Sequence, residues 1–399
     1  MTAAPALPRL REPGAHLGPL PVINVVVLQV GLALGLALLA VDTALWVAAL
    51  LVALITVPLA LGRWHGCWMV RWIQLTSHYL TRSHDTSLPS AEPGSGDPRM
   101  ALLGALIPDL TVAPGADRQR EPVGFVLHQG TWTAVLEVDP PSSMIAPVGD
   151  AAGLPLGALA SCLEDRGVVL DAIQAIWHCY PGNAALSPSS PALRSYLEVL
   201  GPLPAAARRT IWIAVRLDPR RCPDAVAERG GGVTGCHRAL VAALSRVRAT
   251  LESRGVAARP LDAEALLRAG VCAAELPGVA GSRQPVTVSE GWTTVTAAGV
   301  GHTSYAITGW GAAGAPPNLT ALTGVRALST TVALVISPAD GGEVGLQGLV
   351  RVSARNAAEL QAADGQLRAL SQRLNVTLRP LGGLQAAGLA ATLPLGASG

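Results

Sequence analysis

His178 and Cys179 are adjacent in an apolar stretch, and a thiol beside an imidazole is the pairing that a cysteine nucleophile and its general base require. The surrounding segment, Val169 to Tyr180, has the composition of a β-strand. Adjacent side chains of a strand point to opposite faces of the sheet. We therefore interpret the His-Cys pair as structural and not as a catalytic dyad.

Cys222, Cys236 and His237 are residue types that bind zinc. A closed zinc site needs a fourth ligand, and neighbouring residues on a helix project in different directions. The six cysteines form no CxxC pair, which suits neither a zinc knuckle nor a compact disulfide framework. We expect no metal site and mostly buried thiols in a reducing compartment.

Gly230, Gly231 and Gly232 precede a predicted helix, and glycines before a helix N-terminus can bind phosphate. No lysine and no adjoining strand supports such a site, so we interpret the three glycines as a flexible turn. The sequence contains no GxxxxGK[ST], HExxH or GxSxG motif. Glu164 and Asp165, near the end of a predicted helix, are interpreted as a solvated face. Glu137 and Asp139 could share one face of a strand but form no DxD motif. We predict no catalytic residue and no cofactor.

The most apolar part of the chain lies near its N-terminus, where Asp42 is the only charged residue between Leu17 and Leu61. A bilayer core of ~30 Å needs about 20 apolar residues per helix, so this stretch predicts two spans. We expect a two-helix transmembrane hairpin over 21–61, with helices near Pro21 to Val41 and Thr43 to Leu61. The apolar stretch is too long for the core of a cleaved signal peptide.

Gly31 and Gly35 form a GxxxG pattern in the first span, which lets a second helix approach closely. In so glycine-rich a chain, chance also produces this pattern. Asn24 and Gln29 are polar side chains within the same span, and such groups tend to find hydrogen-bond partners on a neighbouring helix. We expect Gly31 and Gly35 to pack against another transmembrane helix.

Trp64, Trp68 and Trp72 follow the second span at intervals of four, with Arg63 and Arg71 beside them. If residues 62–82 form a juxtamembrane amphipathic helix, the three rings lie in one stripe. Tryptophan prefers the headgroup region and arginine can pair with anionic lipid, so we expect contact with the membrane interface. The alternative is a contact surface for a partner subunit, and both can hold together.

Arginines lie on both sides of the hairpin, at Arg9 and Arg11 before it and at Arg63, Arg71 and Arg82 after it. The positive-inside rule then predicts a two-pass protein of a bacterial inner (plasma) membrane with both termini cytoplasmic. A formal net charge of +2 without a basic cluster gives no reason to expect nucleic acid as a partner.

The remaining chain is expected to be one large soluble part. Residues 1–20 are predicted to be a cytoplasmic tail, and residues 83–99 are rich in Pro, Gly and Ser, as in a flexible linker. Residues 100–399 are predicted to form a cytoplasmic mixed α/β domain, and a subdivision near 280–290 is left open. Half of the chain is apolar but only 4% is aromatic, so the core must be built of small aliphatic side chains.

Strand-like and helix-like segments alternate in this part, which indicates a sheet covered by helices. Expected strands are Phe125 to His128, Thr131 to Val138, Val169 to Tyr180, Ile211 to Leu217 (half-buried), Thr293 to Ile307, Thr331 to Ile336, Leu346 to Val352 and Val376 to Leu378. Expected helices contain Leu156 to Leu163 with a stop at Gly167, Leu240 to Leu251 with Thr234 as a candidate N-cap and Gly255 as a stop, and Leu360 to Leu374 opened by Asn356 and Glu359.

The C-terminal run from Asn356 through LNVTLRPLGGLQAAGLAATLPLG resembles the EccE component of the type VII (ESX) secretion systems of mycobacteria. The plan of the chain is also similar: an arginine-containing N-terminus, two early spans, a Trp and Arg segment, then a cytoplasmic α/β domain. Between Met100 and Pro285 we find little resemblance beyond composition.

The resemblance implies a non-catalytic structural subunit at the periphery of an inner-membrane secretion complex, assembled with EccB, EccC and EccD and powered by the EccC ATPase. The hypothesis from another class is a membrane-anchored enzyme acting on lipid or cell-envelope precursors at the cytoplasmic face. It predicts a ligand pocket with perturbed titratable groups. A regulatory binding module is a third hypothesis.

Overall fold

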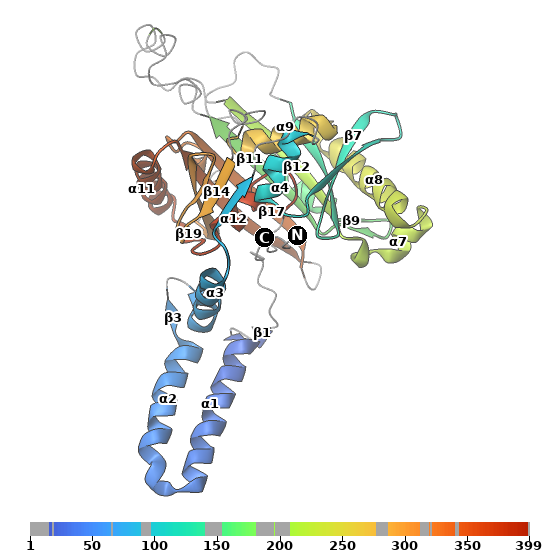
Figure 1. The fold of residues 1–399 in the computed structure, drawn as a ribbon. Coiled ribbons are helices and arrows are strands. Elements are labelled where there is room, and N and C mark those ends of the chain that lie inside the picture. Colours follow the sequence, from blue (N-terminus) through green and yellow to red (C-terminus); the bar gives the residue numbers. More distant parts are fainter. Residues whose placement is uncertain are drawn as a thin grey trace. The chain divides into compact units, whose positions relative to one another are not determined.

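The structure is a computed structural model that describes residues 16–17, 20–64, 67–88, 97–139, 154–180, 195, 208–276, 286–311, 319, 321–339 and 343–397. The chain separates into two compact units, Arg9–Ser83 and a larger unit that contains His84–Gly399 (Figure 1). Each unit is described here by itself.

The smaller unit is built on two apolar helices, α1 (Val22–Val41) and α2 (Trp46–Leu61). Asp42 separates them: its carboxylate accepts a hydrogen bond from the backbone N–H of Ala44 at 2.8 Å and so starts the short 3₁₀ turn η1 (Thr43–Leu45). Segments Val22–Val41 and Thr43–Leu61 are long and apolar enough to cross a membrane. The predicted pair of N-terminal helices is confirmed.

The segment after α2 differs from the single helix expected over 62–82. Gly62 has extended backbone angles and ends α2, and two short strands follow, β3 (Arg63–Trp64) and β4 (Cys67–Trp68). Helix α3 (Met69–Thr81) begins only after this hairpin, where the N–H of Met69 donates to the carbonyl of Gly62 at 3.0 Å. Glycine at positions 62 and 66 disfavours a continuous helix.

The larger unit contains a sheet of 13 strands among the described residues, and every strand pairing in it is antiparallel. The predicted mixed α/β domain is thus confirmed, with one large sheet. In spatial order its strands are β5 (Asp85–Leu88), β14 (Val286–Glu290), β15 (Val295–Ala297), β16 (Val300–Trp310), β18 (Val344–Ala354), β17 (Ser329–Pro338), β11 (Ala172–Tyr180), β12 (Arg208–Leu217), β8 (Thr131–Val138), β7 (Pro122–His128) and β6 (Thr111–Ala116), while β13 (Ala258–Pro260) pairs with β8 and β19 (Val376–Pro380) pairs with β16.

The sheet has helices on both faces. One face, here called the apolar face, carries Ile213, Ala175, Val332 and Val350 from adjacent strands and packs on α8 (Gly232–Glu252) and α11 (Ala357–Arg373). The short elements α7 (Pro223–Glu228) and β9 (Glu164–Asp165) lie at the same end of the sheet as α8 (Figure 1). Helix α5 (Leu156–Ala160) contacts α8, η2 (Pro219–Arg221) contacts α7, and β10 (Val168–Val169) pairs with β9.

The opposite face, here called the polar face, carries His178, Thr331 and Arg351 in register on β11, β17 and β18. Alternation along each strand places these side chains opposite to the apolar set. Three shorter helices cover this face, α4 (Pro98–Leu106), α9 (Ala263–Ala273) and α12 (Gln385–Ala391). The sheet is therefore the middle of three layers.

Two predicted features agree closely with the structure. Gln129 and Gly130 both have positive φ, as the tight turn between β7 and β8 requires. Asn356 caps α11 by accepting from the N–H of Glu359 at 2.9 Å, and its amide donates to the Glu359 carboxylate at 2.8 Å. This reciprocal pair is the expected variant of a capping box.

Several boundaries were predicted wrongly. Asp85–Leu88, placed in the linker over 83–99, forms β5 and pairs with β14, because strand pairing uses backbone groups that composition does not reveal. Helix α5 ends at Ala160, and Gly167 instead lies between the paired strands β9 and β10. Thr234 lies within α8, whose N-cap is Gly231.

Strand β12 was expected to be half-buried, yet Trp212 to Leu217 are all buried. The polar face is covered by helices, and Arg216 is accommodated there by an ion pair with Asp171 at 2.7 Å. No subdivision appears near 280–290 within the described residues, because β13 before that segment and β14 after it belong to one sheet.

Candidate functional site

Gly31 packs closely against α2. A Cβ atom added at Gly31 would overlap the side chain of Thr56, whereas the nearest atom to an added Cβ at Gly35 is the Ala49 carbonyl oxygen at 3.9 Å. Only the first glycine of the GxxxG pattern is therefore required by the helix pair within this chain. That Gly35 packs against another transmembrane helix stays a prediction.

The two polar side chains of the first span differ in their surroundings. Asn24 is buried and its amide donates to the carbonyl of Ala60 at 2.8 Å, so it links the base of α1 to α2. Gln29 is exposed on the surface of the hairpin and has no hydrogen bond within the described part of the chain. Large apolar side chains surround it on the outer surface, including Val30, Leu32 and Leu36 at 62%, 65% and 59% exposure.

The predicted interface residues do not form one helical stripe. Arg63 and Trp64 lie in β3, Trp68 is the N-cap of α3, and Arg71 and Trp72 lie within α3. The Arg63 guanidinium lies over the Trp68 ring, 4.2 Å from its centroid. This cation–π contact keeps one arginine and one tryptophan together despite the break in the helix.

The metal candidates of the larger unit are core residues. His237 stacks on Phe125 with ring centroids 4.1 Å apart and meets Trp132 edge-on, and burial lowers its pKa. Cys222 and Cys236 are both buried, and burial raises the pKa of Cys236. Among the described residues, no group of three His, Cys, Asp or Glu side chains is placed to hold a metal ion.

The other residues considered for chemistry in the sequence also do not come together in one site. Gly230, Gly231 and Gly232 all have positive φ and form the turn before α8. His178 and Cys179 point to opposite faces of β11, as strand geometry predicts, and Cys179 accepts a hydrogen bond from Arg209 at 3.4 Å. Asp165 pairs with Arg246 at 2.7 Å.

A row of polar residues on the polar face, most of them buried, was not predicted from the sequence. Its members lie in register on β12, β11, β17, β18 and β16: Thr210, His178, Thr331, Arg351 and Ser304. The signal was present in the strands themselves, where His178 and Arg351 interrupt apolar runs at positions that share one face.

Hydrogen bonds connect the centre of this row. Arg351, fully buried, donates to the Thr331 hydroxyl at 2.9 Å, and the same hydroxyl lies 2.8 Å from Nδ1 of His178. The Thr331 oxygen accepts from Arg351, and the Thr331 proton is donated to His178 in the tautomer that carries its proton on Nε2. Nε2 faces Oε1 of Glu275 at 3.5 Å.

The same cluster holds the C-terminal end of α9. Tyr180 donates to the carbonyl of Cys272 at 2.9 Å, and Arg351 donates to the carbonyl of Ala273. These bonds satisfy carbonyls that a helix end leaves without intrahelical partners. Glu275, next to this end, has a positive φ of 61°.

Burial governs the titration of the cluster. It lowers the pKa of His178 to about 3, with the nearby Arg351 charge acting in the same direction. It lowers the pKa of Arg351 to about 10 and raises the pKa values of Glu275 and Tyr180. At neutral pH the histidine is thus neutral and the tyrosine keeps its proton.

The C-terminal segment that carries the family resemblance closes the polar face. The Gln385 side chain accepts from the backbone N–H of Ser304 at 2.8 Å and donates to the carbonyl of Leu381 at 3.0 Å. A Cβ at Gly388 would lie 2.6 Å from Cβ of Ser304, and one at Gly383 would lie 2.7 Å from the Trp292 ring. Close packing therefore explains the Gly382-Gly383 pair and the spacing of Gln385 and Gly388.

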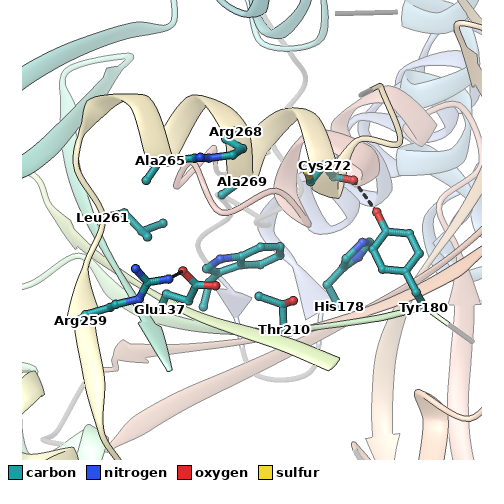
Figure 2. A pocket seen from close by; sticks show the side chains of 11 residues that line it. Glu137, His178, Tyr180, Thr210, Arg259, Leu261, Ala265, Arg268, Ala269 and Cys272 are labelled. Atoms are coloured by element: carbon teal, nitrogen blue, oxygen red, sulfur yellow. Dashed lines mark hydrogen bonds and ion pairs between the residues drawn. The ribbon is translucent and has the colours of Figure 1, made fainter. Parts of the chain in front are cut away.

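A pocket of about 370 Å³ lies between α9 and the polar face (Figure 2). Trp212 and Thr210 line it from β12, His178 and Tyr180 line it from β11, and α9 faces them. Across β12, β8 and β13, Trp212, Glu137 and Arg259 are register neighbours, and Glu137 pairs with Arg259 at 2.8 Å. The remaining lining residues are Leu261, Ala265, Arg268, Ala269 and Cys272.

Part of the chain is similar to proteins of a known family. The model of the EccE family, described as a type VII ESX secretion system translocon, matches residues 205–307. This region runs from before β12 through most of β16, so the family match includes a part of the chain where the sequence analysis had found little resemblance.

The similar proteins are components of ESX secretion systems. The chain is 30% identical over 196 residues to the ESX-5 secretion system protein EccE5 of Mycobacterium marinum, covering 44% of this chain and 43% of that protein. It is 28% identical over 225 residues to the ESX-1 secretion system protein EccE1 of Mycobacterium tuberculosis, covering 54% and 43%. The match to EccE1 of Mycolicibacterium smegmatis is 44% identical over 64 residues, covering 16% and 14%.

The aligned part of the chain thus spans less than half the length of each of these relatives. Among solved structures, an alkyldihydroxyacetonephosphate synthase aligns over 67% of this chain and 43% of its own, with 10% identity and a TM-score of 0.25, which carries no argument about fold or function.

Proposed function

We propose that this chain, which belongs to the EccE family of type VII (ESX) secretion system components, is a structural subunit that stabilises the inner-membrane secretion complex and has no catalytic activity of its own. The observation that carries the proposal is the family match, in which both the family model and the relatives are secretion components. The two apolar helices support membrane attachment of such a subunit.

The exposed surface of the hairpin supports contact with other membrane helices. In lipid, the exposed amide of Gln29 would lack a hydrogen-bond partner, and a polar group from a neighbouring helix would supply one. We assign the partners to the EccB, EccC and EccD components of the same complex, with this chain at its periphery. The energy for export would come from the EccC ATPase.

The orientation we propose has both termini in the cytoplasm of a bacterial cell. Arginines precede and follow the hairpin, while the turn around Asp42 has none. Arg63, Trp64, Trp68, Arg71 and Trp72 would then lie at the cytoplasmic membrane interface or against a partner.

One observation favours the alternative of an anchored enzyme acting on lipid or cell-envelope precursors. The pocket is lined by His178 and Tyr180, whose pKa values are shifted. One ring nitrogen of the histidine and the tyrosine hydroxyl are engaged, however: Nδ1 of His178 lies against Thr331, and the Tyr180 hydroxyl donates to the Cys272 carbonyl. A general base needs an unprotonated atom within reach of substrate, so these bonds support binding over turnover.

The proposal is tested by extracting the C-terminally tagged full chain from its native membrane in mild detergent. A native gel with mass spectrometry should find it in a large complex with an ATPase and a many-span partner. Deletion of the chain should reduce both assembly and secretion. A small, solitary species, or intact assembly and secretion without the chain, would refute a structural role.

Matched variants of the hairpin sharpen this test. Gln29→Leu should reduce co-purification of the partner proteins while the hairpin stays intact, because only an outward polar group is lost. Leu36→Ile, on the same exposed surface, is the control and should leave co-purification unchanged.

A further inference from the structure

The pocket between α9 and the polar face is a consequence of small side chains on α9. Ala265, Ala269 and Cys272 recur at spacings of four and three, so they share one helical face, and that face lines the pocket. Larger residues at these positions would fill the space. The opposite wall is the Trp212 ring, and the end of α9 is held by the hydrogen bonds to its last carbonyls. The hollow is therefore built into a fixed frame.

The charged residues that line the pocket are two arginines, Arg259 and Arg268, and one carboxylate, Glu137. Arg259 is neutralised by Glu137 at 2.8 Å, and Asp139 lies 3.5 Å from it on the same side. Arg268, exposed on α9, has no ion pair or hydrogen bond within the described part of the chain. Figure 2 shows Arg268 on the helix side and the Arg259–Glu137 pair on the strand side. A guanidinium without a partner beside a hollow suits a carboxylate or phosphate.

Aromatic side chains form part of the strand wall of the pocket. His178 lies against Trp212 with centroids 5.8 Å apart and a tilt of 29°, and it meets Tyr180 edge-on at 4.5 Å. Thr210, the register neighbour of His178, adds a hydroxyl to the same wall. Flat rings stack well on such surfaces, and stacking tolerates many ring types.

We propose that this pocket binds a small aromatic anion of mononucleotide size, with its ring against Trp212 and its phosphate or carboxylate on Arg268. A volume of about 370 Å³ is near the lower end of the range for ligand pockets and accommodates one ring system with one acidic group. This binding site goes beyond the proposed role in the secretion complex and does not depend on it.

The test is isothermal titration of the detergent-solubilised full chain with AMP, adenosine and ribose 5-phosphate. These probes separate the ring from the charge, since adenosine lacks the phosphate and ribose 5-phosphate lacks the base. AMP should bind saturably at one site, and each of the other two should bind about tenfold more weakly or less. Absence of saturable AMP binding, or equal binding of AMP and adenosine, would overturn the proposal.

Variants locate the binding in this pocket. Ala265→Leu should abolish AMP binding by filling the hollow. Arg268→Gln should weaken AMP about tenfold and leave adenosine unchanged. Arg373→Gln, an exposed arginine on α11 against the apolar face, is the matched control and should bind AMP as the parent does. If Ala265→Leu does not fold, Arg268→Gln is the deciding variant. An AMP affinity of Arg268→Gln equal to that of the parent chain would show that AMP binds elsewhere.

Discussion

The two faces of the sheet are stabilised by different means. The apolar face packs against α8 and α11, which have 21 and 17 residues, and its contacts are mainly apolar. The polar face is covered by α4, α9 and α12, of 9, 11 and 7 residues. Its buried side chains include Arg351, His178 and Gln385.

The difference shows two ways in which helices are held on a face of the sheet. Long amphipathic helices bury enough apolar surface to hold themselves on the sheet. Short helices bury less, and here their ends and backbone groups are bonded by side chains from the strands, as when Gln174 donates to the Ala391 carbonyl at 2.6 Å. The first arrangement depends on the volume of the packed side chains, whereas the second depends on buried hydrogen bonds and on protonation state.

The largest effect should follow removal of Arg351. Arg351→Ala should lower the free energy of unfolding by about 3–5 kcal/mol, because it leaves Glu275 and the α9 carbonyl without their buried partner. Denaturant unfolding of the solubilised chain measures it. The double variant Arg351→Met with Glu275→Gln should recover part of the loss. A cost of under about 1 kcal/mol for Arg351→Ala would contradict the importance of the polar network.

On the apolar face, the corresponding change is Leu240→Ala on α8. Leu240 is fully buried, so truncation should cost about 3 kcal/mol through lost burial and the cavity left behind. Unfolding midpoints at pH 7 and pH 5 should show the same loss, since no titratable group is removed. A loss that changes with pH would show that the two faces are coupled.

The polar face should be sensitive to acid. The pKa of His178 is about 3 in the folded chain against about 6.5 when unfolded. The unfolded state therefore binds more protons between these values, and stability falls as pH decreases through this window by about 1.4 kcal/mol per pH unit, or about 2 kcal/mol from pH 6.5 to 5. His178→Gln should remove this contribution.

Other groups titrate in the same range, so only the difference between parent and variant is assigned to His178. His302 also has a lowered pKa through burial, whereas the raised pKa of Glu275 acts in the opposite sense and lowers stability as pH rises above about 4.5. Denaturation at pH 7, 6 and 5 measures the slopes. Equal slopes for the parent and His178→Gln would exclude His178 as a source of acid sensitivity.

The smallest effects should come from one glycine on each face. Gly388→Ala should destabilise by about 1–2 kcal/mol, since its Cβ would meet Ser304 and Leu381 side chains at 2.6 and 2.8 Å. Gly365→Ala in α11 has no atom within 4 Å of the new Cβ and should stabilise by about 1 kcal/mol through helix propensity. Thermal unfolding of both variants compares them. Shifts of the same sign would contradict the tight packing of α12.

The sequence alone predicted the features that depend on local pattern. The long apolar stretch broken only by Asp42 predicted α1 and α2 and the turn between them, because helix length is set by bilayer thickness. Periodic leucines with a cap at Asn356 predicted α11, and the Gln129-Gly130 pair predicted the β7–β8 turn. Each of these signals lies within one continuous stretch of the chain, where spacing and conformation are directly linked.

Tertiary structure alone decided the polar face and its pocket. His178 is 153 residues from Thr331 in the chain, and antiparallel pairing of β11, β17 and β18 brings His178, Thr331 and Arg351 together. Ala265 and Ala269 reveal a hollow only when α9 is placed over Trp212. Such contacts are set by strand register and by the helix that covers each face, and neither is encoded in the spacing of neighbouring residues.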